Sequence, residues 1–335
     1  MTGGIRMEHR KLGRTDTLLS FIGLGCVTFG REIDEDTSLS ILDHALENGL
    51  NWLDTAEGYG GGNARTYRRD VLKVDDVRET SDVMGSSEII IGKWLKARGC
   101  RDDVVICSKV SSGNRPDNIV RALEVSLERL QVDCVDIYEL HSPDETVPID
   151  ESLAVLDEAV GAGRIKTVGC SNFNAAQLRE ALDASARRGY ARFEVIQPPY
   201  NLADPGAQDD LFPLCRREEV GITSYSPLAA GFLAGKYTPD RNAFPKGSRF
   251  DVIPGHADIY FNDRNFRNVE RLRTLADSRG LPMVRLAMAW AMGHPDITSV
   301  IVGARHSGHL DNAFEALALK ADTELRDEMS SWLTD

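Results

Sequence analysis

The sequence predicts a (β/α)8 TIM barrel that ends in two extra C-terminal helices. Short apolar runs alternate with stretches of helical periodicity along nearly the whole chain, in about eight pairs, which favours a closed barrel of buried parallel strands. An open sheet would predict a glycine fingerprint after an early strand, but the nearest candidate, GLGCVT at 23–28, lacks the third glycine and opens no helix. The length of 335 residues suits one barrel domain spanning 1–335.

Each predicted strand is a short apolar run, and each predicted helix carries apolar residues three and four positions apart. The first helix shows this pattern clearly and ends at Gly49. Its apolar face holds Leu39, Leu42, Ala45 and Leu46. The strands are expected at 21–25, 51–54, 104–108, 135–138, 165–170, 193–197, 222–225 and 297–302. The helices are expected at 34–48, 117–130, 151–162, 175–184, 209–217, 265–278 and 283–292, followed by the two closing helices.

Two long segments follow predicted strands and are expected on the catalytic face, because the active sites of barrels form on the loops after the strands. Residues 60–85 are rich in glycine and charge, and residues 229–260 carry glycines, prolines and mixed charge. Loops of this length in a compact domain are usually functional or disordered. We therefore expect both long loops to border the active site.

Composition and charge exclude several classes of function. The net charge of −13 disfavours binding of nucleic acid, and it means that a phosphate-bearing ligand must be held by a local basic site. No apolar run approaches the roughly 20 residues of a membrane-spanning helix, and the first residues do not resemble a signal peptide. The six cysteines form no CxxC pair and have no histidine at metal-ligand spacing. We expect a cytoplasmic protein with reduced thiols, no metal site and no membrane or nucleic-acid partner.

Four residues with complementary chemistry lie at the ends of three successive strands. Asp54 ends the second predicted strand and Tyr59 follows it, while Lys109 and His141 come at the ends of the next two, so that all four should meet on one rim. Tyr59 is expected to protonate the alkoxide formed when a carbonyl accepts hydride, with Lys109 drawing the pKa of Tyr59 down. Asp54 is expected to neutralise and aim Lys109, and His141 to hydrogen-bond the substrate oxygen.

The motifs around these residues resemble those of the aldo-keto reductase family, over nearly the whole chain. The matching segments are LDTAEGYG at 53–60, SKV at 108–110, HSPD at 141–144, GRIKTVGCSNF at 163–173, QPPYN at 197–201, SYSPL at 224–228 and GKY at 235–237, with RKLG at 10–13 and GLG at 23–25. The resemblance implies a short N-terminal β-hairpin that closes the bottom of the barrel. It also implies that Asp54, Tyr59, Lys109 and His141 form the catalytic tetrad.

The resemblance further implies a nicotinamide cofactor, NADPH, and the residues that hold it. The implied set is Ser171, Asn172 and Gln197 for the carboxamide, Tyr225 for stacking on the ring, Ser226, Leu228 and Lys236 for the pyrophosphate, and Arg305 and His309 for the phosphate and adenine end. Arg305 precedes a predicted helix, and its guanidinium suits the 2′-phosphate of NADPH. Arg249 is a further candidate for a phosphate contact.

Two departures from the family pattern leave points open. Many members carry Gln where His309 stands and Glu-Asn where Asn312 and Ala313 stand, so NAD remains an alternative to NADP. The Ser-Glu pair that opens the family's next helix is reached only at 87–88, after an acidic, polar insertion. We expect residues 63–83 of this insertion to shape the substrate pocket, toward a large or polyhydroxylated carbonyl compound; a solvated surface insertion is the alternative.

The expected activity is the NAD(P)H-dependent reduction of an aldehyde or ketone, or the reverse oxidation of a sugar-like alcohol, with Tyr59 as general acid. Two other functions stay open. One is a regulatory or redox-sensing subunit that binds NADPH with little turnover, as some family relatives do within membrane-channel complexes. The other is a cofactor-free isomerase or aldolase in which Lys109 forms a Schiff base. The expected partner is a small carbonyl substrate, and homo-oligomerisation is left open.

Overall fold

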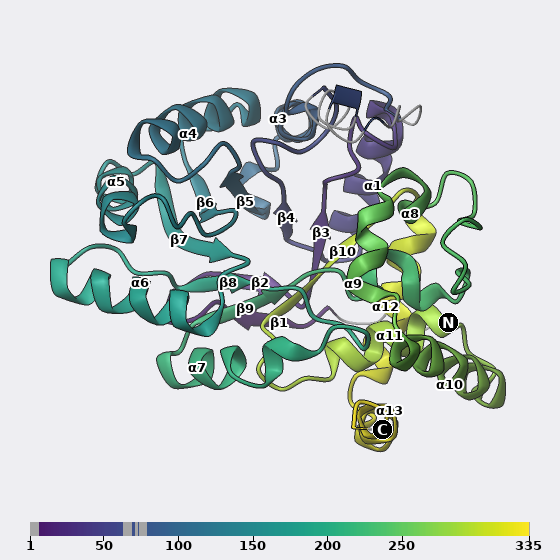
Figure 1. Ribbon diagram of the computed structural model, residues 1–335. Helices are drawn as coiled ribbons and strands as arrows, with labels where there is room; N and C mark the ends of the chain where they lie inside the picture. The colour runs from purple at the N-terminus through teal and green to yellow at the C-terminus, as the bar shows by residue number, and fades with distance from the viewer. Residues whose placement is uncertain (1–6, 63–68, 71–72, 74–78, 335) are drawn as a thin grey trace.

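Eight parallel strands close into a barrel with helices around it in the computed structural model, which describes residues 7–62, 69–70, 73 and 79–334 (Figure 1). The strands follow one another around the barrel in chain order, and the last pairs with the first. They are β3 (Ile22–Gly25), β4 (Trp52–Asp54), β5 (Val105–Val110), β6 (Val135–Leu140), β7 (Ile165–Ser171), β8 (Val195–Gln197), β9 (Gly221–Ser224) and β10 (Ser299–Gly303). The predicted (β/α)8 barrel is confirmed.

Helices separate the strands and add a layer at the C-terminal end. They are α1 (Glu35–Glu47), α3 (Ser86–Arg98), α4 (Pro116–Leu130), α5 (Ile149–Gly161), α6 (Ala175–Arg188), α7 (Leu211–Glu218), α10 (Asp263–Arg279), α11 (Met283–Met292), α12 (Ser307–Leu319) and α13 (Thr323–Ser331). The predicted helix at 175–184 continues to Arg188, where Gly189 supplies the left-handed C-cap. Residues 186–188 are exposed, so no apolar periodicity marks this last turn in the sequence. No helix among these described elements is long and apolar enough to cross a membrane.

The N-terminal hairpin closes the bottom of the barrel, as the family resemblance implied. β1 (His9–Lys11) pairs antiparallel with β2 (Leu18–Ser20). Leu12 and Leu19 are fully buried and pack in one cluster with Trp52 inside the barrel. A Cβ on Gly23 would lie 2.2 Å from the Trp52 ring, so the indole can cross the barrel only because β3 carries glycine there.

The segment 229–260 is more ordered than the predicted loop. It contains η3 (Ala229–Ala234), α8 (Arg249–Val252), η4 (Pro254–His256) and α9 (Ala257–Tyr260). Its aromatic residues pack together, with ring centroids 4.4 Å apart for Tyr237 and Phe250, and Phe250 is fully buried. Glycines and prolines predicted a plain loop, but these rings form a small core that fixes the turns. Of the predicted loop 60–85, residues 63–68, 71–72 and 74–78 lie outside the described residues.

Candidate active site

A buried ion pair lies at the carboxyl end of the barrel, where β4 and β5 are neighbours. Lys109 Nζ donates to Asp54 Oδ1 at 2.5 Å and to the Thr55 carbonyl at 2.8 Å. Lys109 and Asp54 are both buried. Successive residues of a strand point to opposite faces, and this register turns both side chains into the barrel interior below the rim. The ammonium therefore has a charged partner and a backbone acceptor, as a buried cation requires.

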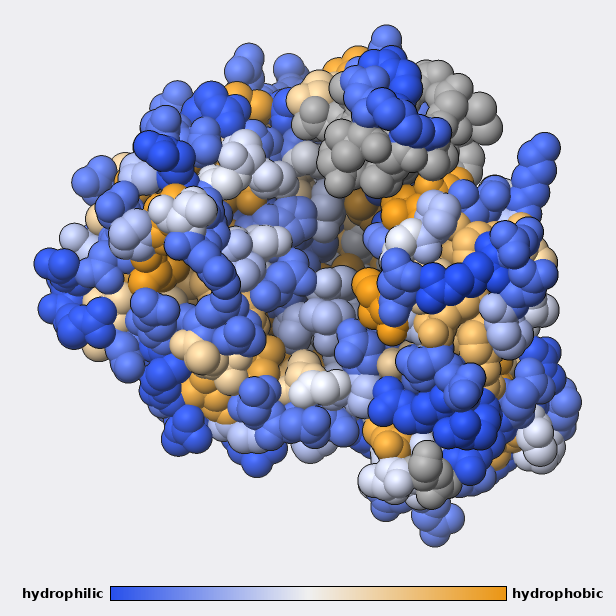
Figure 2. Space-filling view, in the orientation of Figure 1, coloured by the Kyte–Doolittle hydropathy of each residue, from blue (hydrophilic) through white to orange (hydrophobic). Residues whose placement is uncertain are grey.

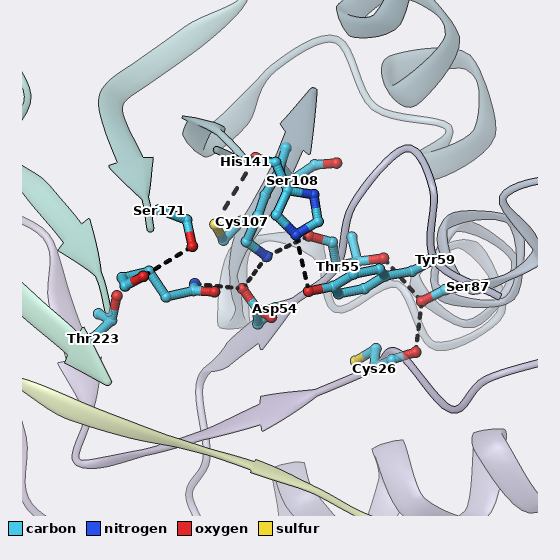
Figure 3. Close-up of polar contacts among 12 residues, drawn as sticks. Cys26, Asp54, Thr55, Tyr59, Ser87, Cys107, Ser108, His141, Ser171 and Thr223 are labelled. Atoms are coloured by element: carbon cyan, nitrogen blue, oxygen red, sulfur yellow. Dashed lines mark hydrogen bonds and ion pairs between the residues drawn. The ribbon is translucent and has the colours of Figure 1, made fainter. Parts of the chain in front are cut away.

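Tyr59 and His141 complete the group above this ion pair. Lys109 Nζ lies 5.0 Å from the centroid of the Tyr59 ring, and the Tyr59 hydroxyl is 3.5 Å from His141 Nε2. Figure 3 shows the Tyr59 and His141 rings pointing toward one another, with Asp54 below them. The structure thus brings together the carboxylate, phenol, ammonium and imidazole that the sequence predicts to meet. In Figure 2 the surface is hollowed at the middle of the same face.

The protonation states of these groups follow from burial and charge. Burial opposes the charge on Lys109, but Asp54 and Tyr59 outweigh it, and the pKa of Lys109 is raised well above its ordinary value. Burial, reinforced by Lys109, lowers the pKa of His141 to about 3. Burial raises the pKa of Tyr59 to about 12, although Lys109 acts in the opposite direction. Lys109 therefore lowers the pKa of Tyr59 as expected, but the expectation that the pKa falls toward the working range is wrong, because burial exceeds the effect of the ammonium.

His141 is neutral at physiological pH, and Ser111 contacts its other ring nitrogen. The Ser111 hydroxyl lies 2.8 Å from His141 Nδ1. If the hydroxyl donates, the ring proton stays on Nε2, the nitrogen that faces Tyr59. Ser111 follows β5 within the loop and carries no motif, so sequence reasoning did not select it.

A chain of hydrogen bonds joins this group to the residues expected to hold the nicotinamide. Gln197 Nε2 donates to Asp54 Oδ1 at 2.9 Å, and the Ser171 hydroxyl donates to the Gln197 carbonyl at 2.9 Å. Asn172 Nδ2 donates to Ser171 Oγ at 3.2 Å, and the Tyr225 hydroxyl donates to Asn172 Oδ1 at 2.7 Å. The structure therefore places these amide, hydroxyl and aromatic groups side by side along the rim from β4 to β9.

Backbone strain is concentrated in the loops at this rim. Asn172 has φ 63°, Ser226 has φ 56°, and Ala229 and Ala230 have φ 51° and 56°. Left-handed φ is uncommon for residues other than glycine and tends to occur at functional sites. Ser226 is held by Asn201, whose side-chain amide donates to the Ser226 carbonyl at 3.0 Å. The loop after β9 is thus fixed in an unusual conformation beside the network.

The remaining residues of the implied cofactor set are spread over the loops after β9 and β10. Leu228 is half-buried just before η3, and Lys236 is exposed, its Nζ 5.3 Å from the Tyr237 ring centroid. Arg249 begins α8 and Arg305 precedes α12. The His309 ring accepts a hydrogen bond from the Arg305 backbone amide at 3.3 Å, and burial lowers the pKa of His309 to about 4. His309 therefore braces the turn that presents the Arg305 side chain.

Two buried or partly buried acids near the predicted site carried no signal in the sequence. Glu139 on β6 pairs in register with Lys109 and is 1% exposed, and Glu32 in the loop after β3 contacts both Arg249 and Arg305. Only the strand register shows that Glu139 faces inward, since every residue of β6 is buried.

A cavity of about 800 Å³, lined in part by Asp136 and Lys166, lies at the other end of the barrel, where the strands begin.

Comparison with known proteins gives the family. The family model of the Aldo/keto reductase family matches residues 21–332. The chain is 31% identical over 324 residues to "Probable voltage-gated potassium channel subunit beta" of Arabidopsis thaliana, covering 93% of this chain and 91% of that one. It is 30% identical over 346 residues to "Aldo-keto reductase YhdN" of Bacillus subtilis (strain 168), covering 98% and 94%. It is 29% identical over 343 residues to "NADH-specific methylglyoxal reductase" of Escherichia coli (strain K12), covering 98% and 99%.

The chain therefore belongs to the aldo-keto reductase family, a family of oxidoreductases that use nicotinamide cofactors. The family resemblance that the sequence motifs indicated is confirmed.

Proposed function

We propose that this protein reduces an aldehyde or ketone to an alcohol with NADPH or NADH, and that Tyr59 is the general acid. The observation that carries the proposal is the meeting of the Lys109–Asp54 ion pair with Tyr59 and His141 at one rim. A neutral His141 can donate from Nε2 to the carbonyl oxygen and hold it near the Tyr59 hydroxyl. Tyr59, whose pKa is raised to about 12, then enters the reaction protonated.

The residues at the rim fit a nicotinamide cofactor. Ser171, Asn172 and Gln197 offer the hydroxyl and amide groups that a carboxamide requires, and the Tyr225 ring lies beside them. Arg305 and Arg249 supply cations for a phosphate, and Ser226, Leu228 and Lys236 lie in the segment that follows β9. When bound, the cofactor supplies the hydride. Lys109, held in place by Asp54, then stabilises the negative charge left on Tyr59 once its proton has gone to the alkoxide.

The geometry disfavours a Schiff-base mechanism. Forming an imine requires a neutral amine, but Lys109 is paired with Asp54 and its pKa is raised well above the ordinary value. The Lys109 Nζ atom also donates to the Thr55 carbonyl, which leaves it held toward the barrel interior.

A regulatory role remains the second candidate, because the Arabidopsis thaliana relative is named "Probable voltage-gated potassium channel subunit beta". Steady-state turnover distinguishes the two. The protein is given NADPH or NADH and a panel of aldehydes, ketones and sugars, and cofactor oxidation is followed by absorbance. The reductase proposal expects turnover on the order of 1 per second or faster with at least one substrate. Tight cofactor binding without measurable turnover on the panel would favour the regulatory role.

A further inference from the structure

A second cluster of charged groups lies on the side of the barrel where α1, α8 and α12 gather (Figure 1). The carboxylate of Glu32, in the loop between β3 and α1, is approached by three guanidinium groups. Arg31 Nη2 is 2.6 Å away, Arg249 Nη1 3.5 Å and Arg305 Nη1 3.8 Å. The arginines come from the loops after β3, β9 and β10, so only the closed barrel brings them together.

The members of this cluster are not equivalent. The side chains of Arg31 and Glu32 are each 8% exposed and form a buried pair. The side chains of Arg249 and Arg305 are 26% and 44% exposed, and they reach Glu32 over longer distances. The cluster therefore presents two half-exposed guanidinium groups beside a buried carboxylate. The three arginines and Glu32 together carry a net charge of +2, in a chain whose net charge is −13.

We infer that Glu32 determines the cofactor preference of this protein, by opposing NADPH and favouring NADH at the adenosine ribose. The inference rests on the proposed function, in which Arg249 and Arg305 supply cations for a phosphate of the cofactor, and it takes this phosphate to be the 2′-phosphate. A phosphate monoester carries about two negative charges near neutral pH, so the Glu32 carboxylate repels what the arginines attract. With NADH, the same carboxylate accepts a hydrogen bond from the ribose 2′-hydroxyl, while the arginines lose their phosphate partner.

Glu32→Gln tests this inference because it removes the charge and keeps the shape of the side chain. NADPH and NADH are titrated separately into the wild type and the variant by isothermal calorimetry, which needs no substrate. Glu194→Gln is the matched control, since Glu194 is a half-buried acid paired with Arg14 and Arg192 just before β8, at the opposite end of the barrel.

Glu32→Gln is expected to raise the ratio of NADPH affinity to NADH affinity by about tenfold or more, and Glu194→Gln to leave it unchanged. Glu32→Asp withdraws the charge by one methylene and is expected to move the ratio in the same direction by a smaller factor. If circular dichroism shows that Glu32→Gln does not fold, the affinity ratio of Glu32→Asp is used as the test instead.

Each other outcome overturns the inference. An unchanged ratio in folded Glu32 variants, or a ratio that moves toward NADH, removes the role of Glu32 and leaves the proposed reductase standing. An equal loss of affinity for both cofactors means that Glu32 is structural. If the wild-type protein binds neither cofactor, the proposed function is refuted, and the inference about Glu32 is refuted as well.

Discussion

Replacing Glu139 with Gln is expected to stabilise the protein at alkaline pH and to change its stability little at acidic pH. Glu139 is 1% exposed, and its Oε2 atom has no hydrogen-bond partner among the described residues. Burial raises the pKa of Glu139 from 4.5 to about 8, with Lys109 acting against the rise and Asp54 with it. Cys107, Cys170 and Tyr59 are the other titratable groups that interact with this carboxyl.

The sign follows from proton linkage. An acid with a higher pKa in the folded than in the unfolded state binds more protons when folded, so the free energy of unfolding falls as pH rises. For Glu139 the fall lies between pH 4.5 and about 8. The upper bound is roughly 5 kcal/mol, and relaxation of the buried site reduces it, so we expect about 2–5 kcal/mol. Glutamine removes this loss, because it does not ionise.

Urea denaturation followed by circular dichroism measures the effect. The free energy of unfolding is determined for the wild type and for Glu139→Gln at about pH 5 and about pH 9, and the difference between them is compared at the two pH values. Any change in the free energy of unfolding that the substitution causes equally at both pH values cancels when the two differences are compared. Glu145→Gln, at an exposed position, controls for the loss of one acid. A difference that stays the same at both pH values would refute the reasoning.

Three further variants and one pH profile test the site. Asp54→Asn leaves Lys109 buried without its charged partner and is expected to lower the free energy of unfolding by about 3–5 kcal/mol in urea titrations. Ser111→Ala removes the contact to His141 and is expected to lower kcat/KM about threefold to tenfold. Arg305→Gln is expected to weaken NADPH binding about tenfold to a hundredfold, with a smaller effect on NADH. Because the pKa of His141 is lowered to about 3, kcat/KM for reduction is expected to show no histidine ionisation between about pH 5 and pH 8.

Controls make these outcomes specific. Ser112→Ala alters the next hydroxyl, which contacts Arg121 and not His141, and is expected to leave kcat/KM unchanged. Equal stability of Asp54→Asn and the wild type would mean that the buried ammonium does not need its partner. Equal weakening of both cofactors by Arg305→Gln would count against a 2′-phosphate contact. A step near pH 6.5 that disappears in a His141 variant would contradict the neutral imidazole.

Much of the barrel was predictable because its strands are buried on both faces. Runs such as 21–25 and 104–108 are apolar almost without interruption, and periodicity separates them cleanly from the amphipathic helices. The segment 229–260 was not predictable in the same way. Its short turns are fixed by contacts among rings far apart in sequence, such as Phe232 and Phe266 with centroids 5.2 Å apart, and local signals do not reveal such packing.

The candidate site was predictable where a motif ends a strand, and not where a role depends on register or on distant loops. Asp54, Lys109 and His141 could be assigned to one rim because parallel strands end at the same face. Glu139 differs from its buried neighbours only through the pairing that sets it beside Lys109. The position of Glu32 between arginines of two other loops exists only in three dimensions.

Single-turnover oxidation of NADPH by Tyr59→Phe tests the assignment of Tyr59 as proton donor most directly. The variant and the wild type are saturated with cofactor, mixed rapidly with the aldehyde that the wild type reduces fastest, and followed by cofactor fluorescence. For Tyr59→Phe we expect unchanged cofactor affinity and a rate of reduction lower by about a hundredfold to ten-thousandfold. A Tyr59→Phe protein that reduces the aldehyde within about threefold of the wild-type rate would contradict it.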